Sequence, residues 1–193
     1  MMTTTLPVPE LYRRCSREFG RRVWAATGSW DAPTPLPGWN VRRLVHHVVE
    51  EERWAPPLLA GQTVSEVGTR LAGDLLGDDP AAAFTAAAAA AEAMAAVAAP
   101  GALDRTVHLS FGDHPGAEYA LQLAADHLVH AVDLARALGL DEAVDPEAAA
   151  AIESWFGPME ATYRSLGAIG PRVEVPADAG PAARLLGLMG RRP

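Results

Sequence analysis

The sequence predicts an all-α fold, a helical bundle formed by a single domain. Apolar residues recur at steps of three and four along most of the chain, as on the buried face of an amphipathic helix. Long alanine-rich stretches add strong helix formers. One short run, Asp104 to Phe111, alternates polar and β-prone residues. With 193 residues, 49% of them hydrophobic, the chain can bury a sizeable core.

Two helix patterns joined by a proline-rich loop occupy the first part of the chain. The first runs from Pro9 to about Thr27, with proline in its first turn and a glycine at its exit. Asn40 is placed as the N-cap of the second, which ends at about Ala60. Residues 61–78 then form a loop with a short helical piece at 64–76.

Helices also dominate the rest of the chain. An alanine-rich helix from Pro80 to about Ala98 is capped by Asp78 or Asp79. The extended segment ends at a turn over 112–116, marked by glycine and proline, and a helix over 117–138 follows. The last predicted elements are a helix from Pro146 to about Ser165 capped by Asp145, a short strand-like RVEV and a small helix, AARLLGLM.

Composition excludes several classes of function. A net charge of −8 and a pI near 5.2 argue against nucleic acid or an anionic membrane as a partner. The single Cys15 excludes an intrachain disulfide and a cysteine-based zinc cage, and it is expected to fill the core. Without a signal pattern or a run of about 18 strongly apolar residues, we expect a cytoplasmic protein. No repeat or boundary divides residues 1–193, and about 170–193 form a tail packed on the domain.

The stretch LQLAADHLVHAVDLARALG carries chemistry on the buried side of its helix. Asp126 and His130 are four residues apart and Asp133 follows three later, so all three share one narrow face. Leucines and alanines flank that face, which therefore points inward. A buried carboxylate and imidazole must be hydrogen-bonded, paired or metal-bound, because burying them bare is costly.

A second inward histidine lies on the helix that begins after Asn40. Leu44, His47 and Glu51 continue with Trp54 and Leu58 at helical spacing, which places His47 inward and leaves His46 off that face. Glu51 stands one turn after His47 and is a further ligand, a general base or an acceptor that sets the tautomer of the ring.

Polar groups on facing helices of a bundle build metal sites in this way. His47, Asp126 and His130 would supply two imidazoles and one carboxylate, which suit Zn²⁺ first and Ni²⁺ or Fe²⁺ as alternatives. Three protein ligands leave a position open for water or substrate, the pattern of a catalytic site. The other reading is a bundle whose buried histidines are hydrogen-bonded and hold no metal.

Two segments resemble signatures of a known superfamily. GWNVRRLVHHVVEEE is similar to the first motif of the DinB/YfiT-like superfamily, and more closely to that of the mycothiol-dependent maleylpyruvate isomerase-type metal-binding domain. In that motif the metal histidine stands eight positions after the tryptophan, which is His47 counted from Trp39. DHLVHAVDLARALG resembles the second motif and implies ligation by Asp126 and His130. The tail resembles the ending of a single-domain subgroup, so the likeness covers nearly the whole chain.

The resemblance implies a DinB-like four-helix bundle in up-down-down-up order, with a long crossover after the second helix. It also implies a divalent metal at one end of the bundle and, for some members, a mycothiol-type low-molecular-weight thiol as cosubstrate. Asn40 and Arg43 replace the Thr and Asp usual in the first motif. The two-domain isomerase carries a further C-terminal domain at its substrate site, whereas this chain has a short tail, so maleylpyruvate isomerisation is not inferred.

The leading functional hypothesis is a metal- and thiol-dependent transferase or isomerase acting on a small electrophile. The metal would bind the thiol as thiolate, and Glu51 or His127 would carry the proton. A metal-dependent hydrolase using bound water and a metal- or ligand-binding module without turnover are the alternatives. His108 and His114 are expected at the surface, with the alternative that one of them reaches a cleft. The bulky stripe that includes Trp155, Phe156 and Tyr163 is expected to serve either the core or a dimer contact, and these three residues are the candidate anchors of a homodimer.

Overall fold

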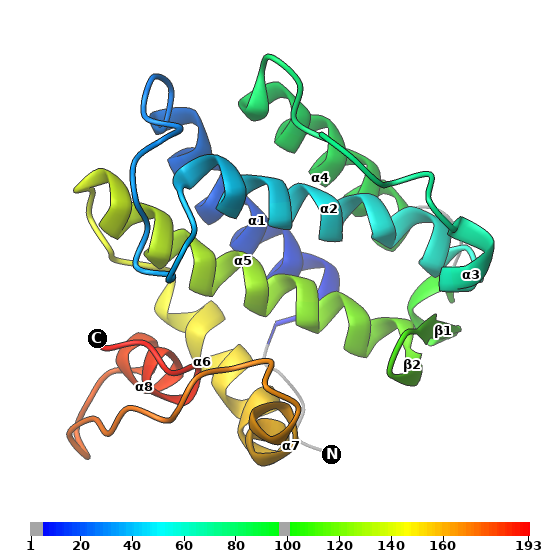
Figure 1. The fold of residues 1–193 in the computed structure, drawn as a ribbon. Helices are drawn as coiled ribbons and strands as arrows, with labels where there is room; N and C mark the ends of the chain where they lie inside the picture. The colour runs from blue at the N-terminus through cyan, green and yellow to red at the C-terminus, as the bar shows by residue number, and fades with distance from the viewer. Residues whose placement is uncertain (1–5, 97–100) are drawn as a thin grey trace.

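Four long helices pack side by side and form the bundle. The computed structural model describes residues 6–96 and 101–193. The bundle consists of α1 (Val8–Ala25), α2 (Val41–Leu59), α4 (Pro80–Ala96) and α5 (Gly116–Leu138). In Figure 1, α1 and α5 run in one direction and α2 and α4 in the other. The all-α class and the up-down-down-up order are therefore confirmed; the predicted end of the alanine-rich helix at Ala98 lies outside the described residues.

Since α2 and α4 are parallel neighbours, the chain must cross the length of the bundle between them. It does so through residues 60–79, which include the short helix α3 (Val64–Val67). Asn40 caps α2 as predicted, because its side chain accepts a hydrogen bond of 2.9 Å from the backbone N–H of Arg43. His46 points away from the bundle interior and holds the crossover through a 2.9 Å contact between its Nε2 and the carbonyl of Gly73.

The core lies between the apolar faces of these helices. Phe19 of α1 and Phe84 of α4 meet edge to face with ring centroids 5.2 Å apart. Cys15 is fully buried, as expected of a core filler. Phe156 is also buried, at 2% exposure, which agrees with the core alternative for its stripe and rules this residue out as a surface anchor of a dimer. The helix stripe that carries it packs inward because a large aromatic side chain is stabilised by burial.

A β-hairpin replaces the single extended segment that alternation predicted. β1 (Thr106–Leu109) pairs antiparallel with β2 (Gly112–Pro115), and Leu109 lies opposite Gly112. The residues assigned to a turn therefore form the second strand. Gly112 adopts a φ of 134°, which side chains disfavour, and this lets the chain reverse over two residues. A further parallel bridge joins Thr63 to His108 and fastens the hairpin to the crossover.

The predicted helix over 146–165 is interrupted. Asp145 caps α6 (Pro146–Phe156) by accepting hydrogen bonds from two backbone N–H groups, as predicted. The chain then forms a 3₁₀ turn over Gly157–Met159 and resumes as α7 (Glu160–Ser165). Pro158 lacks the N–H that a continuous helix needs, which explains the interruption.

The C-terminal tail contains one helix, α8 (Pro181–Leu188), at the position of the predicted AARLLGLM helix. The strand-like RVEV pattern was wrong, because no strand forms over 172–175. The backbone N–H of Val173 instead donates to the carbonyl of Gly187 at the end of α8, 3.0 Å away. The tail packs beside α6, with α7 close by in Figure 1, so its apolar residues are covered by helices and need no partner strand.

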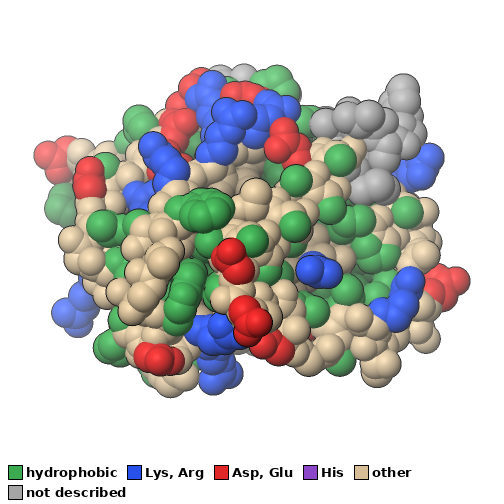
Figure 2. Space-filling view, turned by 90° about the horizontal axis from the view of Figure 1, so that it is seen from above, with side chains coloured by type: hydrophobic (Ala, Val, Ile, Leu, Met, Phe, Trp, Pro, Cys, Tyr) green, Lys and Arg blue, Asp and Glu red, His purple; other side chains and the backbone are tan. Residues whose placement is uncertain are grey.

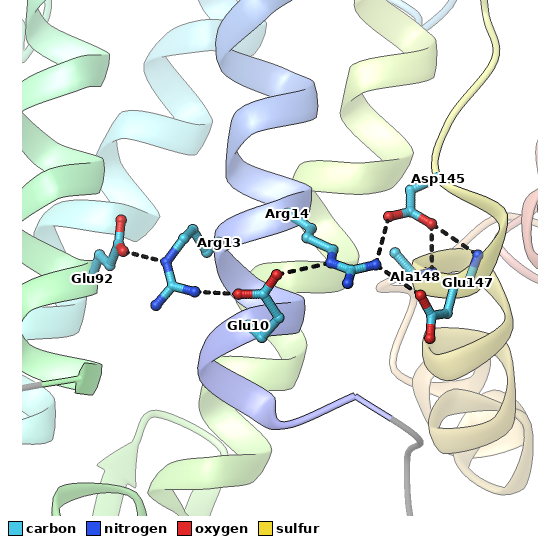
Figure 3. Close-up of polar contacts among 7 residues, drawn as sticks. All are labelled: Glu10, Arg13, Arg14, Glu92, Asp145, Glu147 and Ala148. Carbon is cyan, nitrogen blue, oxygen red and sulfur yellow. Dashed lines mark hydrogen bonds and ion pairs between the residues drawn. The ribbon is translucent and has the colours of Figure 1, made fainter.

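Ion pairs tie α1 to its neighbours on the surface. Figure 3 shows Arg13 reaching Glu92 of α4 at 2.6 Å, and Arg14 reaching Glu147 of α6 at 2.8 Å, with Glu10 between them. Figure 2 shows a face on which acidic and basic side chains are interspersed among hydrophobic ones. Among the described residues, no helix combines the length and the hydropathy needed to cross a membrane.

Candidate metal centre

A cavity of about 520 Å³ opens between α2, α5 and the C-terminal elements. Its floor carries His47 and Glu51 from α2 and Asp126 and His130 from α5. Its walls are largely apolar and come from segments far apart in the sequence: Leu36, Leu123, Val129, Trp155, Ile169 and Met189. Such a concave, mostly apolar site with a few convergent polar groups is typical of small-molecule binding.

His47, Asp126 and His130 are brought together on the floor of this cavity. Nε2 of His47 lies 3.2 Å from Oδ2 of Asp126, and Nε2 of His130 lies 3.2 Å from Oδ1 of the same carboxylate. One ligand atom from each residue falls within 4.8 Å of the others. The i, i+4 spacing on α5 places Asp126 and His130 on one face, and the antiparallel packing of α2 brings His47 opposite.

The donor set fits a divalent metal. Ligand atoms about 2.1 Å from a tetrahedral ion are about 3.4 Å apart, close to the separations seen here. Although His47 is near, Oδ2 of Asp126 is a buried atom with no hydrogen-bond partner of good geometry in the described chain. Trp39 of the first motif packs edge-on against the His47 ring, with centroids 5.3 Å apart, and shields it.

The second nitrogen of His130 is also held. Its Nδ1 lies 2.9 Å from Oδ2 of Asp133, which is fully buried and also receives the guanidinium of Arg191 at 3.0 Å. An Nδ1–H donated to a carboxylate leaves Nε2 with its lone pair free, which is the tautomer a metal needs. A carboxylate behind a metal-binding histidine is a recurrent arrangement.

The carboxylates and imidazoles of the site shift each other's pKa. Burial alone would lower the pKa of His130, but Asp126 and Asp133 outweigh it and raise the value to about 9. Burial opposes ionisation of Asp126 too, yet His130 and His47 hold its pKa well below the usual range. Burial, together with the charge of Asp126, raises the pKa of Glu51 to about 7. Glu51 can therefore both accept and donate a proton near neutral pH.

The raised pKa of His130 predicts a pH-dependent stability in protein stripped of metal. The folded value of about 9 exceeds the ordinary 6.5, so protonated His130 stabilises the fold fully below pH 6.5 and loses this effect as pH rises through 9. Between about pH 6 and pH 10 we expect the stability advantage over His130→Gln to shrink by on the order of 3 kcal/mol. Urea unfolding of both proteins with chelator present measures it; a pH-independent difference would contradict the expectation.

The two predicted proton carriers differ in position. Glu51 lines the cavity beside the donor set. His127 is 1% exposed and lies on the other side of α5, packed against the rings of Tyr12, Phe19 and Phe84. It is not among the residues that line the cavity. One position along a helix turns a side chain by about 100°, so neighbours of Asp126 face different surroundings.

A buried polar cluster, formed by Tyr12, Glu52 and His127, was missed by the sequence analysis. Tyr12 donates its hydroxyl hydrogen to Oε2 of Glu52 over 2.5 Å, and Nε2 of His127 lies 2.6 Å from Oε1. Glu52 is fully buried. The sequence did contain a signal for this burial, because Glu52 lies at helical spacing from the apolar residues Val45, Val48, Val49 and Leu59. The three consecutive glutamates concealed it, since their charge favours a solvated face.

Two polar residues of α5 that line the cavity were also missed. Tyr119 is 4% exposed, and its hydroxyl has no hydrogen-bond partner among the described residues. The same holds for the side-chain nitrogen of Gln122. Both lie on the α5 face that leads to Asp126, at steps of three and four residues. His108 and His114 do not line the cavity: they pair with Asp113 and Glu118 in and beside the hairpin.

Sequence comparisons agree with this geometry. The profile of a family described as the mycothiol maleylpyruvate isomerase N-terminal domain matches residues 12–135, which include all three donor residues. Two uncharacterized proteins of Mycobacterium tuberculosis, MT0763 of strain CDC 1551 / Oshkosh and Rv0738 of strain ATCC 25618 / H37Rv, are each 33% identical over 168 residues. The match covers 82% of this chain and 83% of each relative.

A solved structure shares the fold. The crystal structure of a histidine-to-alanine mutant of mycothiol-dependent maleylpyruvate isomerase superposes with a TM-score of 0.57 at 18% identity. The superposition covers 70% of this chain and 64% of that one. About a third of the solved chain therefore has no counterpart here, and the likeness at this identity is one of fold.

Proposed function

Because the chain belongs to the mycothiol maleylpyruvate isomerase N-terminal domain family, we propose that it is a divalent-metal- and thiol-dependent transferase or isomerase acting on a small electrophile. His47, Asp126 and His130 are the proposed metal ligands, with zinc first and nickel or iron as alternatives. The observation that carries the proposal is the convergence of these three donors on the floor of a cavity large enough for a small molecule.

The proposed chemistry assigns a role to each group of the cavity. A divalent metal supplies the positive charge that lowers the pKa of a bound thiol or water. Glu51, with its pKa of about 7, accepts the thiol proton. The sulfur then bonds to the electrophilic carbon of an epoxide, a halide or an unsaturated acid. An epoxide C–O bond opens or a C=C double bond accepts the electron pair, and Glu51 returns the proton to the resulting oxygen or carbon. With a halide, the carbon–halogen bond breaks, the halide leaves as its anion and Glu51 passes the proton to solvent. In an isomerase the added thiol leaves again after rotation about the new single bond, which restores the double bond.

The remaining cavity residues support binding. Tyr119 and Gln122 offer unpartnered donors to an acceptor atom of the thiol or electrophile. The apolar walls exclude water and strengthen these interactions. His127, the other proton carrier considered, is enclosed with Glu52 away from the cavity, so Glu51 is the better candidate.

The experiment that tests this proposal follows a thiol added to zinc-loaded protein. We expect mycothiol, with glutathione and cysteine as comparisons, to show increased thiolate absorbance at neutral pH. We also expect thioether products from epoxide, haloalkane or unsaturated-acid acceptors by mass spectrometry. Glu51→Gln should keep the metal and lose about 10²- to 10⁴-fold in turnover, whereas Glu50→Gln, at a neighbouring half-buried position, should not. Metal-loaded protein that never perturbs any thiol would refute the proposal.

The same site also suits a hydrolase, because Glu51 lines the cavity together with the proposed ligands and would act as the base toward a metal-bound water. Ester, amide and lactone substrates offered without thiol separate this second candidate from the first. A ligand that binds without reaction would favour the third alternative, a binding module without turnover. The predicted homodimer stays a prediction, which light scattering of the purified protein tests. Two of its proposed anchors, Trp155 and Tyr163, line the cavity.

A further inference from the structure

The C-terminal segment, residues 168–191, forms one wall of the cavity. Ala168, Ile169, Met189 and Arg191 all line it. Arg164 of α7 holds this segment by donating to the carbonyls of Gly170 and Leu188. The segment therefore contributes to the site although it lies beyond residues 12–135, the part of the chain that matches the family profile.

The segment folds back on itself with little free space. The backbone N–H of Arg191 donates to the carbonyl of Leu186 at 2.8 Å. A Cβ on Gly187 would lie 2.6 Å from the carbonyl oxygen of Val173, a distance that side chains do not tolerate. This close packing fixes the position of Arg191, whose side chain reaches Asp133 of α5.

Arg191 connects the segment to the metal centre through one carboxylate oxygen. Its guanidinium lies 3.0 Å from Oδ2 of Asp133, and the same oxygen lies 2.9 Å from Nδ1 of His130. Arg191 and Asp133 are separated by 58 residues in the sequence. The path therefore runs from the tail, through a buried carboxylate, to the ring whose Nε2 faces Asp126.

The buried carboxylate of Asp133 depends on its ion pair with Arg191 for charge compensation. It is fully buried, its Oδ1 has no hydrogen-bond partner in the described chain, and Arg191 is the one arginine paired with it there. A buried carboxylate deprived of its cation is strongly unfavourable, and it turns toward water or another donor when it can. Such a movement would release Nδ1 of His130 and with it the orientation of the ring.

We propose that Arg191 is a positioning residue of the metal centre, through which metal binding at His130 and docking of segment 168–191 over the cavity stabilise each other. The inference rests on the proposed metal site. Because coupling between two sites is reciprocal, metal should tighten the segment by the same factor by which the segment tightens the metal. Metal binding would then strengthen the contact between Arg191 and Asp133 that holds this wall of the cavity in place.

The test compares Arg191→Met with Arg192→Met, a substitution of the adjacent exposed arginine. Zinc affinity is measured by competition with a chromophoric chelator, and hydrogen exchange is followed in peptides from 168–191 with and without zinc. We expect Arg191→Met to weaken zinc binding about 10- to 100-fold and Arg192→Met to leave it unchanged. In wild type, zinc should slow exchange in the segment, and in Arg191→Met it should not.

Two further measurements separate positioning from general stability. Asp133→Asn combined with Arg191→Met should weaken zinc binding by less than the product of the two single effects, because both act through one oxygen. Thermal unfolding in chelator reports any loss of fold that is unrelated to metal. If Arg191→Met does not fold, the zinc dependence of exchange in wild type, together with Arg191→Lys, decides the question.

The outcomes distinguish this inference from the proposed function. Wild type that binds zinc without slowing exchange in 168–191, or Arg191→Met with wild-type zinc affinity, would overturn the positioning role and leave the metal centre in place. Wild type that binds no zinc would overturn both. An Arg191→Met protein that is folded, binds zinc weakly and no longer protects the segment would support the coupling.

Discussion

Alanine in place of His47 or His130 is expected to abolish metal binding. Wild-type protein purified without added metal should contain about one equivalent of zinc or nickel, because three donors converge on one point. Removing one of three ligands should weaken binding by more than the about 100-fold typical for the groups behind a ligand. Elemental analysis of the purified variants and chelator competition measure the change.

His46→Ala is the matched control for this experiment. His46 neighbours His47 in sequence but contacts the crossover and does not line the cavity. The His46→Ala protein should retain the metal. If the wild-type protein contains no metal and does not bind added Zn²⁺ or Ni²⁺, the enzyme proposals are all refuted. The three residues would then be a hydrogen-bonded part of the helix interface, and the family relationship would concern the fold.

Glu52→Ala is expected to destabilise the protein by about 3–5 kcal/mol, because it removes the shared partner of two buried polar groups. Tyr12 and His127 are 2% and 1% exposed, so neither can recover its lost contact from water. For a chain of this length the loss corresponds to a decrease in Tm of roughly 10 °C. Calorimetry and urea unfolding measure it.

Glu50→Ala, on the half-buried side of the same helix, should change the stability by less than about 0.5 kcal/mol. Tyr12→Phe should cost about 1–3 kcal/mol, since it deletes one hydrogen bond and leaves a carboxylate oxygen unsatisfied. A Glu52→Ala protein as stable as Glu50→Ala would mean that the cluster contributes nothing, and that packing alone holds α1, α2 and α5 together.

Local patterns determined the helices and one half of the site. The 3.6-residue period predicted α1, α2 and α5 to within a few residues, and the helix propensity of alanine predicted α4. Asn40 and Asp145 marked two helix starts correctly. The same period places Asp126 and His130 on one face of α5 without any knowledge of the fold. A helix fixes the relative direction of its own side chains, so sequence spacing is sufficient at this range.

Local patterns were insufficient where the outcome depended on neighbours distant in the chain. The hairpin over 106–115 forms because its two strands pair with each other. The backbone of RVEV instead hydrogen-bonds to the end of a helix, through Val173 and Gly187. The alternation of residues is the same in both cases. What differs is whether a complementary edge lies within reach, which propensity does not record.

The sequence by itself determined that the chain forms a helical bundle and that His47, Asp126 and His130 face inward, because periodicity and motif spacing are properties of single helices. Only the tertiary structure decided which neighbouring polar residues share their surroundings. Glu51 enters the cavity while Glu52 enters the core, and Arg191 reaches Asp133 across 58 residues. These contacts depend on the relative rotation and distance of packed elements, and a few tens of degrees in helix orientation exchange one environment for another.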